Sequence, residues 1–269
     1  MENIDLLAEK IYLHFRDAKN RSYPLLLEKE EIKKVLERIN NSSNSFYFID
    51  EIDGEIQGIC IYYINNKELY IQTEIFLSFN HNKKFINEVL SNLIETYPDY
   101  IIDIGVEAEN SFIIDELKNK GFKIMDDLYS TSIKVNERRY SKYPDIELIV
   151  LNQWDSLKKI HQQYFDSGYW TFERIKENFD IWKIYSINND QQNKEYIFIK
   201  TSPSDGSYEI FGIFANSLEE RKRLIEHSLA SLNDNESMYY FIENEKEVEI
   251  CKKLGFTIHG HYQDWQYKK

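Results

Sequence analysis

The sequence predicts an α/β (α+β) protein made of two tandem domains, each a mixed, mostly antiparallel sheet flanked by helices. The first observation behind this prediction is an internal repeat. Glu-Asn followed by Lys-x-x-Gly-Phe spans residues 109–122 and returns 134 positions later at residues 243–256, and Glu-Ile-Phe at residues 74–76 returns 135 positions later at residues 209–211. The second is that both halves show the same order of predicted elements. A repeat of this length is the size of a whole domain, so we expect a duplicated domain.

The composition of the 269 residues is that of a globular protein, with 42% hydrophobic and 15% aromatic residues. This is enough apolar material to build cores, so we do not expect a disordered chain. The formal net charge is −13. That charge argues against a nucleic-acid-binding protein and against docking on an anionic membrane, because both need a basic surface. It weakly favours a cationic or amine substrate.

The chain contains two cysteines, Cys60 and Cys251, one in each half and both in apolar surroundings. We expect two free, buried thiols in a reducing compartment. The first residues are acidic and lack the pattern of a secretory signal, and the apolar runs are too short to span a membrane. These features predict a cytoplasmic protein. The sequence leaves the oligomeric state open between monomer and homodimer.

In the first half, residues 4–18 and 28–39 place apolar side chains at helical spacing. Asp53-Gly54 is a strong hairpin turn, so strands are expected on both sides of it. Gly121 ends a short helix, where a cap with positive φ is expected. The predicted elements are helices at 4–18 and 28–39, strands at 46–50, 55–64 and 68–79, a helix at 83–96, a strand at 100–106, a helix at 111–120 and a strand at 122–135.

The polar stretch at residues 136–145 is the predicted linker between domains at 1–135 and 146–269. After a short strand at 146–151 the pattern starts again, and the last helix is stopped by Gly255 as the earlier one is by Gly121. The predicted elements are helices at 153–165 and 171–182, strands at 183–187, 195–200 and 208–214, a helix at 218–232, a strand at 238–242, a helix at 248–254 and a strand at 256–267.

This order of elements, the hairpin Asp53-Gly54-Glu55-Ile56-x-Gly58, and the Asn … Gly-Phe ending of each half resemble the GCN5-related N-acetyltransferase (GNAT) superfamily. The resemblance implies that acetyl-CoA binds in a V-shaped cleft between the fourth and fifth strands. It also implies that the pantetheine pairs with the backbone of strand four and that the pyrophosphate sits on amides at the start of the following helix. The amine then attacks the thioester directly, without an acyl-enzyme.

Both cofactor loops depart from the family pattern, because residues 79–85 and 215–223 contain no glycine. The second loop places Glu219 and Glu220 where pyrophosphate would sit, and the first places Lys83 and Lys84 there. The first half is therefore the predicted cofactor site, unless the two lysines are an ordinary solvated helix start. The residues predicted to bind the cofactor are Phe76, Leu77, Phe79, Asn82, Lys83, Lys84 and Asn110.

The tyrosine that serves as general acid in the family is replaced by Leu117 and Cys251. Candidate general bases are strand carboxylates, because a partly buried carboxylate can have a raised pKa and accept an amine proton. Each is alternatively an ordinary surface carboxylate of a strand, and Glu109 and Glu243 could equally be helix-start residues favoured by the helix dipole. His259 and His261 share a strand face but have no third ligand nearby in sequence, so no metal site is predicted. The predicted catalytic residues are Glu74, Glu109 and Glu209, with Glu107 and Glu243 as further candidates.

The sequence thus supports two hypotheses. The first is an N-acetyltransferase that uses acetyl-CoA to acylate a small amine, with one half degenerate. The second is a non-catalytic protein with the same fold that binds a small ligand or a protein partner. Acetyl-CoA binding distinguishes them, because only the first hypothesis requires it.

Overall fold

A computed structural model describes residues 4–39, 41–136, 140–158, 161–162, 170–187, 195–202 and 207–269. The chain forms two compact units. The first unit comprises Met1–Leu128 and Gly260–Lys269, and the second comprises Tyr129–His259. The predicted boundaries, 1–135 and 146–269, assumed two contiguous domains and differ from this division. The difference arises because two long strands, β6 (Lys123–Lys134) and β12 (Thr257–Tyr267), each contribute residues to both units.

The first unit is built on a sheet with strand order β2-β3-β4-β5-β12, in which β4 and β5 are parallel and the other neighbours are antiparallel. A short strand, β1, also pairs with β5. Its elements are α1 (Ile4–Phe15), β1 (Ser22–Tyr23), α2 (Lys29–Ile39), β2 (Ser45–Ile52), β3 (Glu55–Asn65), β4 (Tyr70–Ser78), α3 (Lys83–Thr96), β5 (Ile101–Glu107), α4 (Ser111–Asn119) and the parts of β6 and β12 given above.

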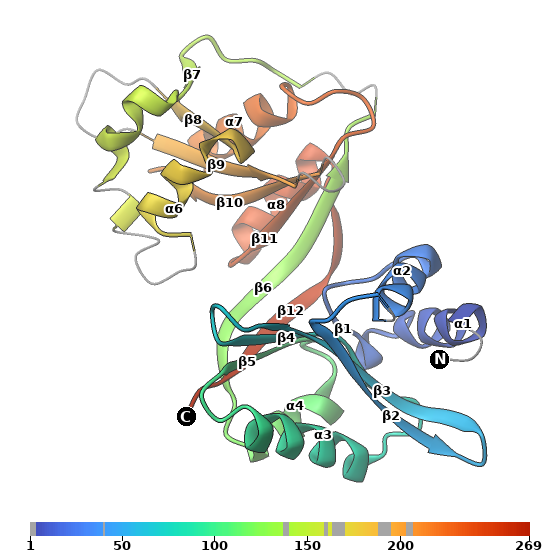
Figure 1. The fold of residues 1–269 in the computed structure, drawn as a ribbon. Helices are drawn as coiled ribbons and strands as arrows, with labels where there is room; N and C mark the ends of the chain where they lie inside the picture. Colours follow the sequence, from blue (N-terminus) through green and yellow to red (C-terminus); the bar gives the residue numbers. More distant parts are fainter. Residues whose placement is uncertain are drawn as a thin grey trace. The chain divides into compact units, whose positions relative to one another are not determined.

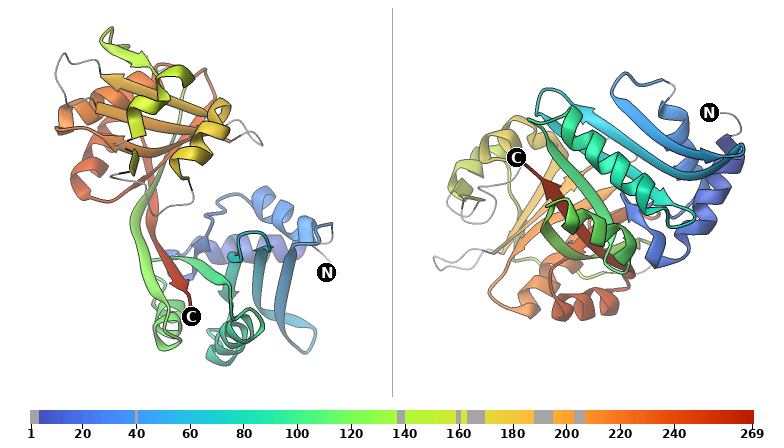
Figure 2. Two further views of the ribbon diagram at one scale, coloured as in Figure 1. Left: turned by 60° about the vertical axis from the view of Figure 1, so that its left-hand side comes forward. Right: turned by 90° about the horizontal axis from the view of Figure 1, so that it is seen from below.

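Helices cover both faces of this sheet (Figures 1 and 2). On one face α3 and α4 pack on Ile71, Phe76 and Ile104, and on the other α1 and α2 pack on Ile59 and Ile75. The apolar residues of α2 recur every three or four positions, which places them on one side of the helix. The unit is therefore a three-layer sandwich with one core on each side of the sheet.

The second unit repeats this plan with the order β6-β11-β10-β9-β8-β7, and β10 and β11 are its parallel pair. One core lies under α7 and α8, and the other surrounds Trp154 and Phe172 on the opposite face of the sheet (Figure 1). Its elements are β7 (Ile146–Leu148), a 3₁₀ helix (Leu151–Leu157), α6 (Phe172–Glu177), β8 (Trp182–Ile187), β9 (Glu195–Thr201), β10 (Tyr208–Phe214), α7 (Leu218–Leu229), β11 (Ser237–Ile242) and α8 (Glu245–Leu254).

The ends of α4 and α8 are built alike, as the 134-residue repeat predicts. Asn110 and Asn244 are the N-caps, and each side chain accepts a hydrogen bond from the amide three residues later. Gly121 and Gly255 follow the helices with φ of 85° and 99°. In both units the next residue, a phenylalanine, donates its amide to a carbonyl five residues earlier, at 3.0 and 2.9 Å. Equivalent caps at equivalent positions are the structural evidence for duplication.

The Glu-Ile-Phe repeat, in contrast, does not mark equivalent positions. In β4 the pairing with β3 skips Glu74, and in β10 the pairing with β9 skips Phe211. The bulged residue that matches Glu74 is therefore Phe211, and Glu209 lies two residues before it. The expectation that Glu74 and Glu209 occupy equivalent positions in the two units was wrong. It matched the two Glu-Ile-Phe tripeptides by identity alone and did not allow for extra residues in the loops between the repeated elements.

The structure corrects two more expectations. The helix predicted at 171–182 ends at Glu177, and Trp182 already begins β8. The helix predicted at 153–165 begins as a 3₁₀ helix. Residues 159–160 and 163–165 of this prediction lie outside the described part of the chain, as do residues 137–139 of the predicted linker.

Cys60 and Cys251 are free and buried, as expected. Among the helices that the structure describes, none combines the length and apolar character of a membrane span.

We predict that Gly260→Ala destabilises the first unit. A Cβ atom at this position would overlap the carboxylate of Glu107, which lies on the neighbouring strand β5. Overpacking of this kind costs about 1–3 kcal/mol. Chemical denaturation of the purified variant measures the loss. In a Glu107→Ala background the same substitution should cost less, because the clashing group is gone; equal costs in both backgrounds would contradict this account.

Candidate functional site

The two parallel strands of the second unit, β10 and β11, separate after a short stretch of pairing. Tyr208–Ile210 of β10 pair with Met238–Tyr240 of β11. Beyond this point lies a cavity of about 380 Å³. It opens at the carboxyl ends of two parallel strands, where ligands bind in open α/β sheets. We call this cavity the second-unit cleft; its lining residues are Phe211, Gly212, Ile213, Phe214, Ala215, Arg221, Tyr240, Phe241, Glu243, Asn244 and Glu247.

Glu247 is the centre of the polar contacts in this cleft. Its carboxylate accepts hydrogen bonds from the Tyr240 hydroxyl at 2.6 Å and from the Asn244 side chain at 2.6 Å, and it pairs with the Arg221 guanidinium at 2.8 Å. Three donors thus fix a carboxylate with 7% of its side chain exposed. Burial, and secondly the adjacent Glu247, raise the pKa of Tyr240 far above its usual range, so its hydroxyl keeps its proton.

The start of α7, next to the cleft, is acidic, and two backbone amides there donate to side chains. The backbone amide and the side-chain amide of Asn216 both donate to Glu195, at 3.0 and 2.8 Å. Ser217 caps the helix by accepting from the Glu220 amide at 3.2 Å. Glu219 and Glu220 occupy the first turn, and burial together with the neighbouring Glu220 raises the pKa of Glu195. Carboxylates therefore surround the helix terminus, where an anion would otherwise bind.

In the first unit the corresponding space is filled by the protein's own chain. Tyr70–Gln72 of β4 pair with Ile101–Asp103 of β5, and then β1 enters. Ser22 and Tyr23 pair with Val106 and Gly105 of β5, and the Ser22 hydroxyl accepts the Phe76 amide of β4 at 3.0 Å. β1 therefore bonds to both strands at the place where they part.

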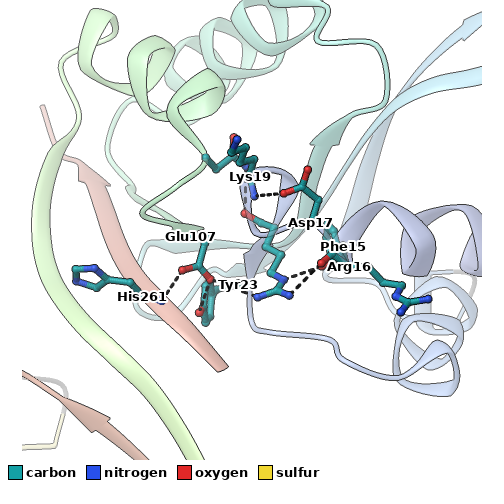
Figure 3. A network of polar contacts seen from close by, with 9 residues as sticks. Phe15, Arg16, Asp17, Lys19, Tyr23, Glu107 and His261 are labelled. Atoms are coloured by element: carbon teal, nitrogen blue, oxygen red, sulfur yellow. Dashed lines mark hydrogen bonds and ion pairs between the residues drawn. The ribbon is translucent and has the colours of Figure 1, made fainter. Parts of the chain in front are cut away.

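Glu107 holds this inserted strand (Figure 3). Its carboxylate accepts the Tyr23 hydroxyl at 3.2 Å and the backbone amide of His261, and the Arg21 guanidinium lies 4.0 Å away. The Arg21 carbonyl in turn accepts the Glu107 amide at 3.2 Å and the Asn110 side chain at 3.1 Å. Burial raises the pKa of Glu107, and the hydrogen bonds and the arginine lower it by less. Glu107 therefore fixes β1 in place.

The residues predicted to bind the cofactor in the first unit have structural partners there. Phe76 and Leu77 are buried in the two cores. The Lys83 ammonium pairs with Glu116 at 3.2 Å and that of Lys84 with Glu88 at 3.6 Å.

The three remaining predicted cofactor residues also have roles in the first unit. Asn82 caps α3 by accepting the amides of Lys84 and Phe85, and Asn110 caps α4. Phe79 packs its ring against His14 at 5.1 Å. The geometry therefore favours the second unit as the ligand site.

The three predicted catalytic glutamates are in different surroundings. Glu74 pairs with Arg38 of α2, and Glu109 is exposed before α4. Glu209 is half-buried on β10, one residue before the pairing with β11 ends, in register with Lys200 of β9 and Tyr239 of β11. Burial raises the pKa of Glu209, and Lys200 lowers it by less. Of the candidate bases, Glu243 lines the cleft, and Glu209 lies on β10 two residues before the lining residue Phe211.

Sequence reasoning missed two parts of this arrangement. A two-residue strand before a proline gives no periodic signal, so β1 is not among the predicted elements. The contacts among Arg221, Glu247 and Tyr240 join three separate elements. Only the 134-residue repeat, in which α8 is the counterpart of α4, could have pointed to Glu247. Cys251, at the family's general-acid position, is buried, and burial raises its pKa to about 12.

Comparison with known proteins shows the fold. The crystal structure of a GCN5-related N-acetyltransferase from Sphaerobacter thermophilus matches 98% of this chain and 92% of its own, with a TM-score of 0.66 and 10% identity. A GCN5-related N-acetyltransferase from Kribbella flavida matches 86% of this chain and 91% of its own, with a TM-score of 0.54 and 8% identity. The chain has the GNAT fold. A tandem GNAT protein from the clavulanic acid biosynthesis pathway matches 99% of this chain and 94% of its own, with a TM-score of 0.50 and 9% identity.

Comparison by sequence provides less information about this chain than comparison by structure. No family model matches the chain. A glutamyl-tRNA reductase from Methanococcus maripaludis is 23% identical over 212 residues, which are 79% of this chain. The chain spans about half, 52%, of that protein's length. An identity this low does not carry an activity from one protein to the other.

Acetyl-CoA, the donor that the resemblance implies, fits the second-unit cleft only in part. The aromatic and aliphatic side chains of β10 suit an acyl-pantetheine arm. The carboxylates of Glu195, Glu219 and Glu220 do not suit a pyrophosphate, because like charges repel and the Asn216 and Glu220 amides already donate to side chains. The residues therefore fit the thioester arm and not the nucleotide diphosphate.

A pair of buried carboxyls lies on the sheet of the first unit. Asp103 of β5 and Asp264 of β12 are 5% and 4% exposed, and the Tyr70 hydroxyl donates to Asp103. Burial, and secondly Asp103, raise the pKa of Asp264 far above its usual range. Among the residues that the structure describes, no group of three or more His, Cys, Asp or Glu could hold a metal ion.

We predict that Asp264→Asn stabilises the protein at pH 8 by at least about 1 kcal/mol. The folded state binds a proton at Asp264 that the unfolded chain releases above about pH 4, so the wild type loses stability as the pH rises. Asparagine does not ionise and can still donate to Asp103, so this loss should disappear. Urea unfolding at pH 4 and pH 8 measures it. The exposed control Asp99→Asn should keep the wild-type pH dependence; a variant Asp264→Asn that is less stable at pH 8 would refute the argument.

Proposed function

We propose that the protein is an acyltransferase that moves an acetyl group from a thioester to a small amine, and that the second-unit cleft is its donor site. The observation that carries this proposal is the cavity between β10 and β11 in a GNAT fold, at the point where the two parallel strands part. In the first unit that place is taken by β1. We therefore assign the first unit a structural role.

Glu209 is the proposed general base. It lies where the parallel pairing ends, and its raised pKa suits a group that must accept a proton near neutral pH. The amine nitrogen forms a bond to the acyl carbon while the carbon–sulfur bond breaks; Glu209 takes the proton that the amine loses, and the thiolate gains one from solvent. Glu243, unlike Glu209, is one of the residues that line the cleft, and its negative charge favours a cationic or neutral amine over an anionic acceptor.

The alternative is a binding protein that has kept the fold without the reaction. The specific observation in its favour is that Cys251 replaces the family's general acid and is a buried thiol with a raised pKa. A thiolate leaving group is weakly basic, so a missing acid slows transfer without preventing it. The two candidates differ in whether a thioester is consumed.

Glu209→Gln should lower the rate of acyl transfer by a factor of about 10² to 10⁴, the usual contribution of a general base, with little change in donor affinity. Thiol release from S-acetylpantetheine, with spermidine or tyramine as the amine, measures the rate. The wild-type rate should rise with pH through the raised pKa of Glu209, and the variant should lose this rise. Glu74→Gln, the strand carboxylate of the first unit, is the control and should stay within about twofold of the wild type.

Lys83→Glu combined with Lys84→Glu should leave donor binding unchanged, because both lysines lie in the first unit, where they pair with Glu116 and Glu88. Isothermal titration calorimetry with S-acetylpantetheine and with acetyl-CoA measures binding. A loss of binding in this double variant would place the donor in the first unit. No binding of either thioester to the wild type would exclude the acyltransferase.

A further inference from the structure

The arginine and lysine side chains of α7 are paired with carboxylates of the second unit. The Arg221 guanidinium contacts Glu247 at 2.8 Å, and the Lys222 ammonium lies 3.9 Å from Glu219. Both oxygens of Asp145 accept from the Arg223 guanidinium, each at 2.7 Å. This helix begins beside the second-unit cleft. A phosphorylated ligand bound there would need positive side chains as partners, and these ones are already paired with carboxylates of the protein.

Three backbone amides around the start of α7 donate to internal partners. The Asn216 amide donates to Glu195, the Glu220 amide to the Ser217 hydroxyl, and the Arg221 amide to the Ser217 carbonyl at 3.1 Å. Glu195 is 2% exposed and accepts two hydrogen bonds from Asn216, so this carboxylate is built into the fold. Through Asn216, the residue before the N-cap Ser217, it places a carboxylate close to a helix terminus, the kind of place where anions bind in other proteins.

We propose that the second-unit cleft takes a thioester donor without a nucleotide diphosphate, and that Glu195, Glu219 and Glu220 exclude the pyrophosphate of CoA. The donor class is then an acylated pantetheine or a similarly uncharged acyl thioester. This inference rests on the proposed function, since it assumes that the cleft holds a thioester arm. The reaction is unchanged: the amine nitrogen replaces sulfur on the acyl carbon, and a free thiol leaves.

Calorimetry with S-acetylpantetheine and acetyl-CoA tests the inference on the wild-type protein. We expect S-acetylpantetheine to bind about tenfold more tightly than acetyl-CoA at low salt, because carboxylates near a pyrophosphate repel it. Added salt should strengthen acetyl-CoA binding, since screening weakens repulsion, and should leave S-acetylpantetheine unaffected. Phosphate binding driven by attraction would weaken with salt.

Glu219→Gln combined with Glu220→Gln isolates the carboxylates. Acetyl-CoA affinity should rise about tenfold, and S-acetylpantetheine affinity should stay within about twofold. Glu37→Gln combined with Glu95→Gln, two exposed residues of the first unit, changes the net charge equally and should alter neither affinity.

Tighter binding of acetyl-CoA that weakens with salt would overturn the exclusion of the nucleotide and leave the acyltransferase standing. Failure of both thioesters to bind would overturn the proposed function and this inference with it. The salt dependence is measured on the wild type, so the inference stays falsifiable if the double variant does not fold.

Discussion

Each unit depends on one constraint: two parallel strands stay paired for three residues and then part. Beyond that point the facing backbone groups need new partners or contact with solvent, because a buried backbone polar group without a hydrogen bond costs about as much free energy as a lost bond. The first unit supplies the partner from its own chain, and the second leaves a cavity. The two copies have diverged at the place where the fold offers a binding site.

The inserted strand β1 is held by contacts from separate parts of the first unit. Ser22 bonds to β4, Arg21 bonds to β5 and α4, and Tyr23 bonds to the buried carboxylate of Glu107. Glu107 also accepts the amide of His261, which comes from the strand at the end of the chain. Through Glu107, β1 is therefore linked to β12, the strand that completes the sheet of the first unit. Because β1 is part of the chain, it competes with any ligand for the space between β4 and β5.

Charge distinguishes the second unit in a different way. The net charge of −13 spreads over the whole chain, but at α7 the carboxylates have specific positions. They accept hydrogen bonds from Asn216 just before the helix, pair with Arg221 and Lys222, and occupy the first turn. Acidic residues in a first turn are favoured by the helix dipole, so the same residues that stabilise the helix also reduce its attraction for phosphate. The acidic residues at the start of α7 therefore affect both the stability of the helix and its affinity for a phosphorylated ligand.

The sequence by itself predicted the 134-residue repeat and the ends of α4 and α8, because these follow from local rules: a cap at Asn110 or Asn244, a positive φ at Gly121 or Gly255, and the spacing of apolar residues. It also identified Glu219 and Glu220 as unfavourable for pyrophosphate. Only the tertiary structure decided which copy keeps an open cleft, because that depends on Ser22–Tyr23 bonding to strands more than fifty residues away. Pairing between distant segments has no periodic signature in the sequence, so the sequence offers two candidate positions for the cleft and does not show that β1 fills one of them.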